Sequence, residues 1–319
     1  MTRVLVTGAT GFIGGVLCEA LASADYLVRG ALRTDRAVPA AIAEKVVVGD
    51  INSTTDWTQA LRGVDLVIHA AARAHVLHPA QGTANLYFET NERGTQRLAN
   101  AAAQMQVARF VLLSSIKVNG EETPIRAYTS ADDPQPQDAY GMSKWHAEQH
   151  VAAAAGHGGM QAVIVRPPLV YGPRVRANFL RLLRWVDRGW PLPFGAVRNR
   201  RSLVNVWNLC DFLLLVLKHP DAPGTWMVSD GEDLSTPDLI RRIGTAMGRR
   251  VRLPSVPVGF LQLSAGLVGR GGELARLCGS LAVDITQTQA QLGWSARVSV
   301  DAALARTVAW YLDGAPPDP

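Results

Sequence analysis

Three side chains near the middle of the chain, Ser115, Tyr140 and Lys144, have the types and spacing needed for proton transfer to an oxygen atom. Tyr140 and Lys144 stand four residues apart, so a helix would place both side chains on one face and within reach of a common ligand. The pKa of a free phenol is about 10, and a neighbouring ammonium group would lower it toward neutral pH. We therefore predict that Tyr140 donates or accepts the proton while Ser115 bonds to the same substrate oxygen.

A glycine-rich turn joins the first predicted strand to the first predicted helix. The apolar run 4–6 precedes it, and apolar residues recur at helical spacing after Gly15. Such a turn aims the N–H groups of a helix N-terminus at an anion, and glycine lets the backbone approach a pyrophosphate. Turns that bind nothing also carry glycines, so the motif depends on its context. In this context we predict a dinucleotide site made by Gly8, Thr10, Gly11, Phe12, Ile13 and Gly14.

The end of the second predicted strand, residues 26–32, bears on which dinucleotide is bound. Enzymes that use NAD place an acidic residue there for the ribose 2′-hydroxyl, whereas an arginine accommodates the 2′-phosphate of NADP. Leu32 takes the place of the acid, and Arg33 and Arg36 follow. NADP(H) is therefore favoured, with NAD(H) as the alternative if Arg33 is only a solvated surface residue.

Apolar runs alternate with segments of helical periodicity over the first half of the chain, which is typical of parallel sheets. This predicts an α/β fold, a doubly wound parallel Rossmann sheet with a smaller interleaved C-terminal substrate-binding lobe. Asp138 is expected to cap the helix that carries Tyr140. The predicted nucleotide-binding domain is residues 1–170, with returns to its sheet at 203–206 and 225–228, and the predicted lobe is residues 171–202 and 231–319.

The motifs together resemble one known family. The chain has T-G-x-x-G-F-I-G from Thr7, N-x-x-G-T from Asn91 and Y-x-x-x-K from Tyr140. These resemble the extended short-chain dehydrogenases/reductases, within the NAD-dependent epimerase/dehydratase group that includes UDP-glucose 4-epimerase. The resemblance covers nearly the whole chain and implies an enzyme that moves a hydride on a nucleotide-activated sugar.

The resemblance also implies positions for further cofactor and catalytic residues. Asp50 would lie against the adenine amino group, and the small residues after His69 would lie along the diphosphate and the nicotinamide ribose. His69 itself is expected to be structural. Asn91 would steady the next helix turn and the water network of the active site. The remaining cofactor-binding residues implied are Arg33, Ile51, Ala70, Ala71, Ala72, Tyr140, Lys144 and Pro167.

At positions that would contact the substrate, the chain departs from the family pattern. Leu169 replaces an asparagine of the family motif, and Asn119 stands where relatives that read S-S-x-x-V-Y-G have a tyrosine. A UDP-sugar is the implied substrate, with two arginines suited to its pyrophosphate. The implied substrate-binding residues are Ser115, Lys117, Asn178, Arg201 and Arg276.

The segment around Lys117 and Asn119 looks most like a subgroup from bacterial surface-polysaccharide and O-antigen synthesis. Some of its members are UDP-QuiNAc 4-reductases, which reduce UDP-4-keto-6-deoxy-N-acetylglucosamine, and others are 4-epimerases that retain NAD. We favour the reductase. A dehydratase is disfavoured because Ile116 and Lys117 replace the acidic pair of that class. A non-catalytic NADP sensor or scaffold is disfavoured because Tyr140 and Lys144 are both kept.

Composition excludes several other classes. Of 319 residues, 48% are hydrophobic and 18% charged, as in globular enzymes rather than disordered chains. The net charge of +5 comes from scattered arginines with no basic run between aromatic residues, so no nucleic acid partner is expected. The three cysteines are isolated and His75 and His78 lack a third ligand, so no metal site is expected. We also expect no signal peptide, no membrane span, a cytoplasmic location and compatibility with a homodimer.

Overall fold

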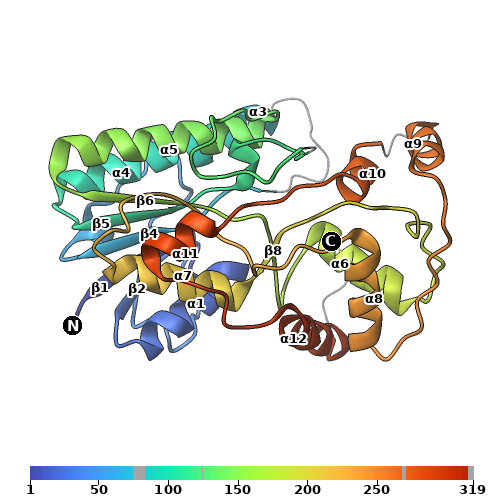
Figure 1. Ribbon diagram of the computed structural model, residues 1–319. Coiled ribbons are helices and arrows are strands. Elements are labelled where there is room, and N and C mark those ends of the chain that lie inside the picture. The colour runs from blue at the N-terminus through green and yellow to red at the C-terminus, as the bar shows by residue number, and fades with distance from the viewer. Residues whose placement is uncertain (75–82, 124, 268–270, 315–319) are drawn as a thin grey trace.

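The computed structural model describes residues 1–74, 83–123, 125–267 and 271–314. Its centre is a seven-stranded parallel sheet with the strand order β3-β2-β1-β4-β5-β6-β9 (Figure 1). The order reverses between β1 and β4, which is the point where sheets of this class bind ligands at the carboxyl ends of their strands. The strands are β1 (Arg3–Thr7), β2 (Leu27–Leu32), β3 (Glu44–Val47), β4 (Leu66–His69), β5 (Arg109–Leu113), β6 (Gln161–Arg166) and β9 (Gly224–Met227).

Helices cover both faces of this sheet, as the sequence predicts. Along β1, Val4 and Val6 face one layer and Leu5 faces the other, because successive strand residues point to opposite faces. In Figure 1, α4 and α5 lie above the sheet and α1 and α7 lie below it. The layer below contains α1 (Phe12–Ser23), α7 (Val206–Lys218) and α11 (Thr286–Leu292), and the layer above contains α2 (Thr58–Leu61), α4 (Gly94–Gln104) and α5 (Ala139–Gly158).

One predicted strand lies elsewhere. β8 (Leu203–Asn205) pairs in parallel with β7 (Leu169–Tyr171) in a separate two-stranded sheet, so the predicted return of 203–206 to the main sheet is wrong. Pro167 and Pro168 lack N–H groups and end the ladder of β6, so the chain leaves the main sheet there. The return at 225–228 is confirmed, because β9 pairs with β6.

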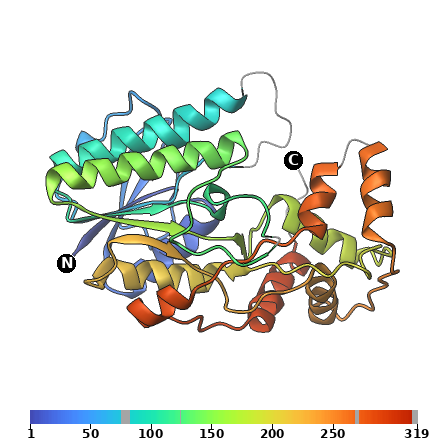
Figure 2. The same cartoon turned by 45° about the horizontal axis from the view of Figure 1, so that its top comes forward.

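The C-terminal lobe has its own apolar core at the other end of the molecule (Figure 2). Phe179 and Leu183 of α6 are buried against Ile240 of α8 and Val308 of α12. Tyr171 connects the lobe to the sheet region by donating a hydrogen bond to Asp230 at 2.9 Å. The helices of the lobe are α6 (Ala177–Asp187), α8 (Thr236–Ala246), α9 (Val258–Leu267), α10 (Gly271–Cys278) and α12 (Val300–Leu312).

Two irregular helical turns flank the carboxyl ends of β4 and β5. The helix that leads to Asn91 begins as α3 (Thr83–Tyr87) and widens into a π-helical turn, η1 (Phe88–Arg93), before α4. A 3-10 turn, η2 (Ile116–Val118), follows β5.

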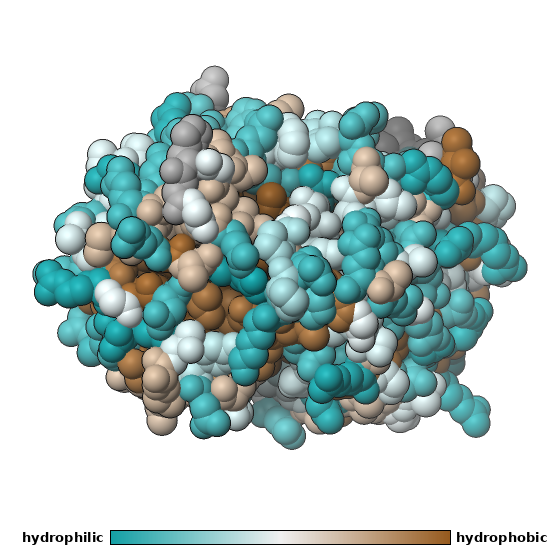
Figure 3. Space-filling view, turned by 60° about the vertical axis from the view of Figure 1, so that its left-hand side comes forward, coloured by the Kyte–Doolittle hydropathy of each residue, from teal (hydrophilic) through white to brown (hydrophobic). Residues whose placement is uncertain are grey.

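The surface combines hydrophilic and hydrophobic side chains, as the composition of the chain leads one to expect. In the face turned forward in Figure 3, hydrophilic side chains dominate and hydrophobic ones gather near the middle. Within the described ranges, no helix combines the length and the hydropathy that crossing a bilayer requires.

Candidate active site

The glycine turn between β1 and α1 is too tightly packed for side chains. A Cβ on Gly14 would lie 2.0 Å from the carbonyl oxygen of Gly8, and Gly8 itself has φ of +69°. The N-terminal end of α1 has Gly11 at its cap position and no side-chain cap. Its first N–H groups are therefore available to an anion, in the geometry that a dinucleotide pyrophosphate uses.

The loop after β4 lies directly against this turn. A Cβ on Gly8 would lie 2.9 Å from the backbone nitrogen of Ala71, and that N–H donates to Thr7 Oγ1 at 3.1 Å. Ala70 and Ala71 thus border the glycine turn.

The His69 side chain is buried and hydrogen-bonded through both ring nitrogens. Its Nδ1 lies 2.7 Å from Thr7 Oγ1 and its Nε2 lies 2.9 Å from Thr95 Oγ1. Thr95 donates to the carbonyl of Asn91 at 2.5 Å, so the hydroxyl has to accept from His69 Nε2–H. Burial, with a smaller effect from Lys144, lowers the pKa of His69 to about 3. These contacts give His69 a structural role.

Arg33 and Asp50 face each other at the carboxyl ends of β2 and β3. The Nη1 of Arg33 lies 3.6 Å from Asp50 Oδ1, and both side chains are about three quarters exposed. Ile51 points instead toward α4, since a Cβ on Gly94 would come within 2.6 Å of its Cγ2. The structure thus brings together the two residues predicted to bind the adenosine end.

Ser115 and Tyr140 come together although they are 25 positions apart. Ser115 follows β5, where its side chain accepts from Lys117 N at 3.2 Å, and Tyr140 lies in the first turn of α5. Asp138 caps α5 by accepting from Gly141 N at 2.7 Å, which confirms the predicted cap. The Ser115 side chain lies close enough to the Tyr140 phenol to lower its pKa, in opposition to the effect of burial.

Lys144 lies one turn beyond Tyr140 on α5 and is 1% exposed. Its ammonium donates to the carbonyl oxygen of Leu113 at 2.7 Å. Burial lowers the pKa of Lys144 to about 8, and the charge of Glu148 opposes that shift.

The pKa of Tyr140 differs from the sequence expectation. Burial raises it to about 12; the Ser115 side chain lowers it, and Asp138 and Tyr87 raise it further. Lys144, whose ammonium is directed at the Leu113 carbonyl, does not lower this pKa in the protein alone, and a lowering by Lys144 together with a bound oxidised nicotinamide stays a prediction. The phenol is therefore protonated at neutral pH.

Asn91 acts on the backbone rather than on the reacting groups. Its amide accepts from Arg73 N at 2.8 Å and donates to Arg73 O at 3.0 Å and to Ser143 Oγ at 3.1 Å. These bonds tie the loop after β4 to α5. They give Asn91 a part in positioning the loop and α5, and its role in catalysis stays a prediction.

Lys117 is bound by two carboxylates. Its Nζ lies 2.6 Å from Glu121 Oε1 and 2.5 Å from Asp138 Oδ2. An ammonium group has three N–H donors, so binding a substrate oxygen does not require Lys117 to leave either carboxylate. Pro167 backs this turn, because its carbonyl accepts from Ile116 N at 3.0 Å.

Arg201 and Arg276 are neighbours in the lobe. The Nη1 of Arg201 donates to the carbonyl of Arg276 at 2.6 Å and to that of Gly279 at 3.0 Å. Part of the Arg201 guanidinium therefore holds the C-terminal end of α10. Asn178 lies in the first turn of α6 and is partly buried.

Sequence reasoning missed a buried polar cluster behind the catalytic residues. Glu148 accepts from Ser114 Oγ and from Arg166, whose Nη2 lies 2.6 Å from Glu148 Oε2. Both partners of this ion pair are less than 5% exposed. The signal that could have found it is the spacing of Tyr140, Lys144 and Glu148, which puts all three on one face of a helix.

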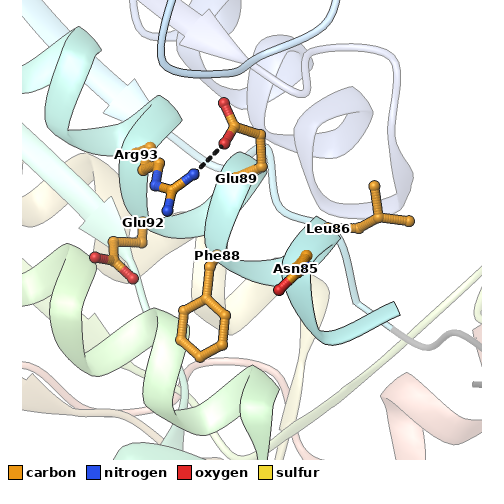
Figure 4. Close-up of a pocket in the computed structure, with 6 residues that line it drawn as sticks. All are labelled: Asn85, Leu86, Phe88, Glu89, Glu92 and Arg93. Atoms are coloured by element: carbon orange, nitrogen blue, oxygen red, sulfur yellow. Dashed lines mark hydrogen bonds and ion pairs between the residues drawn. The ribbon is translucent and has the colours of Figure 1, made fainter. Parts of the chain in front are cut away.

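A separate open pocket of about 570 Å³ lies on the outer side of α3 and η1 (Figure 4). It contains the ion pair of Arg93 with Glu89 at 2.8 Å and none of the three catalytic candidates. No group of metal-ligating side chains occurs in the part of the chain that the structure describes. His75 and His78 lie outside the described residues.

Comparisons with known proteins agree with this geometry. A model of the NAD dependent epimerase/dehydratase family matches residues 4–229. A UDP-glucose 4-epimerase of Vibrio cholerae is 40% identical over 314 residues, which cover 97% of this chain and 95% of that protein. An N-acetyl-alpha-D-glucosaminyl-diphospho-ditrans,octacis-undecaprenol 4-epimerase of Escherichia coli O157:H7 is 28% identical over 81% of this chain and 77% of its own.

Among solved structures, MoeE5 in complex with UDP-glucuronic acid and NAD is 26% identical, with a TM-score of 0.78 over 98% of this chain and 99% of that one. The family model covers more than half of the chain, and the Vibrio relative covers nearly all of it. The chain therefore belongs to the NAD-dependent epimerase/dehydratase family of extended short-chain dehydrogenases/reductases.

Proposed function

We propose that this protein is an NAD(P)-dependent oxidoreductase that acts at C4 of a nucleotide-activated sugar, with Tyr140 carrying the proton. The observation that carries the proposal is the grouping of Ser115, Tyr140 and the buried Lys144 where β5 ends and α5 begins. The raised pKa of Tyr140 keeps its phenol protonated at neutral pH, which suits proton donation to a carbonyl oxygen. Reduction and 4-epimerisation both use this proton, so our preference for reduction of a 4-keto group rests on Arg33 and on the resemblance around Lys117.

The residues at the sheet's switch point fit a dinucleotide. Gly8, Gly11 and Gly14 leave backbone where a side chain would clash, and the N–H groups of α1 suit a diphosphate. Arg33 and Asp50 would hold the adenosine end, with Arg33 favouring a 2′-phosphate. A nicotinamide bound there would supply the hydride.

The protein's own residues would handle the proton. Ser115 would donate a hydrogen bond to the sugar carbonyl oxygen and polarise it. Tyr140 would transfer its phenolic proton to the same oxygen, and the charge of Lys144 would stabilise the phenolate that remains.

We propose a UDP-sugar as the substrate, with residues 171–202 and 231–319 as the lobe that binds it. Two of the similar proteins are a UDP-glucose 4-epimerase and a complex with UDP-glucuronic acid. Arg201 and Arg276, which are neighbours here, suit a pyrophosphate, and Asn178 and Lys117 would contact the sugar nucleotide. A homodimer and a cytoplasmic location stay predictions.

The finer proposal is reduction of a UDP-linked 4-keto-6-deoxy-hexosamine with NADPH. Its support is the exposed Arg33 and the resemblance around Lys117. The second candidate is a UDP-sugar 4-epimerase that retains NAD, and the Vibrio relative favours it.

Two incubations separate these candidates. The first contains the protein, UDP-4-keto-6-deoxy-N-acetylglucosamine and NADPH, and we expect loss of NADPH absorbance with a 4-hydroxy product. The second contains UDP-N-acetylglucosamine or UDP-glucose without added cofactor. Interconversion of 4-epimers in the second, with no NADPH loss in the first, would replace the reductase by the epimerase. Inactivity in both would reject the C4 chemistry with these sugars.

A further inference from the structure

Three consecutive residues at the end of β5 hold three successive turns of α5. Ser115 lies beside Tyr140, the carbonyl of Leu113 accepts from Lys144 at 2.7 Å, and the hydroxyl of Ser114 donates to Glu148. This contact set fixes how far α5 is shifted and turned relative to the sheet.

Glu148 is then bound from a second strand. The Nε of Arg166, the last residue of β6, donates to Glu148 Oε1 at 3.0 Å, and its Nη1 donates to Asn119 Oδ1 at 3.1 Å. Asn119 directly follows η2, the turn that begins after Ser115. The bonds therefore close a ring from β5 through α5 and β6 and back to the turn that carries Ser115.

All members of this ring are buried. Ser114, Asn119, Glu148 and Arg166 are each exposed by 4% or less. A carboxylate and a guanidinium so far from water are tolerated only when they are paired and hydrogen-bonded, as they are here. Their contacts are also directional, which an apolar cluster of the same volume would not provide.

We propose that Ser114, Glu148 and Arg166 are positioning residues that hold Lys144 and Tyr140 in register with Ser115 for the reaction. The inference rests on the proposed function for its kinetic readout, but the placement of Lys144 can be tested without a substrate. Ser114 has the most specific role. If α5 were shifted by one turn along the sheet, the Ser114 hydroxyl would no longer meet the Glu148 carboxylate.

The charged and polar groups around Lys144 set its pKa. On α5 these are Tyr140 and Glu148, on β5 the Leu113 carbonyl, on β4 the neutral His69, and behind Glu148 the guanidinium of Arg166. Glu148 is the anion among them, and its charge favours the ammonium form. Loss of that charge is expected to lower the pKa of Lys144 below its value of about 8.

The chain contains only four lysines, Lys45, Lys117, Lys144 and Lys218, so lysine-labelled protein gives an NMR spectrum that is simple enough to titrate residue by residue. We would compare wild type with Glu148→Gln and assign Lys144 by Lys144→Arg. The matched control is Glu44→Gln on β3, at the edge of the sheet, which removes an ion pair with Arg29 of β2. We expect Lys144 to titrate lower by about one pH unit in Glu148→Gln and to be unchanged in Glu44→Gln.

Kinetics test the positioning. We expect Ser114→Ala to lower kcat about tenfold while KM and the cofactor Kd change less than about twofold, and Ser114→Thr to recover most of the loss. A Ser114→Ala variant with a lower Tm but wild-type kcat, or an unshifted Lys144 in folded Glu148→Gln, would overturn the proposal. If wild type turns over none of the sugars, the proposed function fails, and the Lys144 titration still decides whether the ring acts on Lys144.

Discussion

At the scale of single residues, neighbours decide the role of a side chain. His69 could be a general base by type, but its two ring nitrogens are occupied by Thr7 and Thr95. Tyr140 is an ordinary phenol until its burial and its proximity to Ser115 are known. The sequence predicts which residues matter, because their spacing matches a motif, but pKa directions depend on burial that no local pattern contains.

The burial of His69 predicts a stability that depends on pH. Its pKa is lowered to about 3, so between the unfolded value of about 6.5 and pH 3 the unfolded chain binds a proton that the folded chain does not. The free energy of unfolding should therefore fall below pH 6.5, by at most about 1.4 kcal/mol per pH unit from this residue. Urea unfolding of wild type and His69→Gln between pH 7 and 4 measures this. An equal slope in both proteins would show that His69 does not contribute.

Arg33 predicts which cofactor is preferred. Its guanidinium lies at the end of β2 beside Asp50, where it can pair with a 2′-phosphate. We expect Arg33→Ala to weaken NADPH binding by about 1 to 3 kcal/mol and NADH binding much less. Fluorescence titration with both cofactors measures the difference, with Arg62→Ala as an exposed control. Equal losses for NADPH and NADH would make Arg33 a surface charge only.

At the scale of elements, the sequence predicts strands and helices well where their period is strong. Apolar runs predict the parallel strands, and an aspartate just before a helical segment predicts the cap at Asp138. The sequence does not predict the pairing of β7 with β8, because tertiary packing selects the strand partners after Pro167 and Pro168 end β6. The π turn at Asn91 has no sequence signal either, although it brings that amide to Arg73 and Ser143.

The packing of α1 on β1 can be tested through a glycine. A methyl group at Gly14 would meet the Gly8 carbonyl at 2.0 Å, so α1 would have to move away from the turn. We expect Gly14→Ala to lose about 1 to 3 kcal/mol of stability and most of its cofactor affinity. Gly156→Ala on α5 is the control, since nothing lies within 4 Å of its Cβ position and alanine favours helix. Thermal unfolding and cofactor titration compare them, and unchanged affinity in Gly14→Ala would remove the turn from the binding site.

At the scale of the whole molecule, charge is divided unevenly. Residues 171–202 and 231–319 contain 17 arginines and nine acidic residues, whereas the rest of the chain has more acidic than basic residues. The positive net charge that the composition gives for the chain thus belongs to the lobe. Such a field favours the approach of an anionic substrate such as a nucleotide diphosphate.

Salt should therefore weaken substrate capture. We expect KM for the UDP-sugar to rise several-fold as ionic strength increases from roughly 0.02 to 0.5 M, with little change in kcat, because screening shortens the reach of the arginines. Steady-state kinetics in a series of sodium chloride concentrations measures this. A KM that stays constant would mean that the charge of the lobe does not act on the substrate.

The central claim is that Tyr140 carries the proton while a hydride moves at C4 of the sugar. The most direct test uses two samples of NADPH, each deuterated at one of the two C4 positions of the nicotinamide, with UDP-4-keto-6-deoxy-N-acetylglucosamine and either wild type or Tyr140→Phe. We expect deuterium at sugar C4 from one of the two samples with wild type, and a rate lower by about 10² to 10⁴ with Tyr140→Phe. Absence of label at C4, or a Tyr140→Phe rate above about a tenth of wild type, would contradict the account.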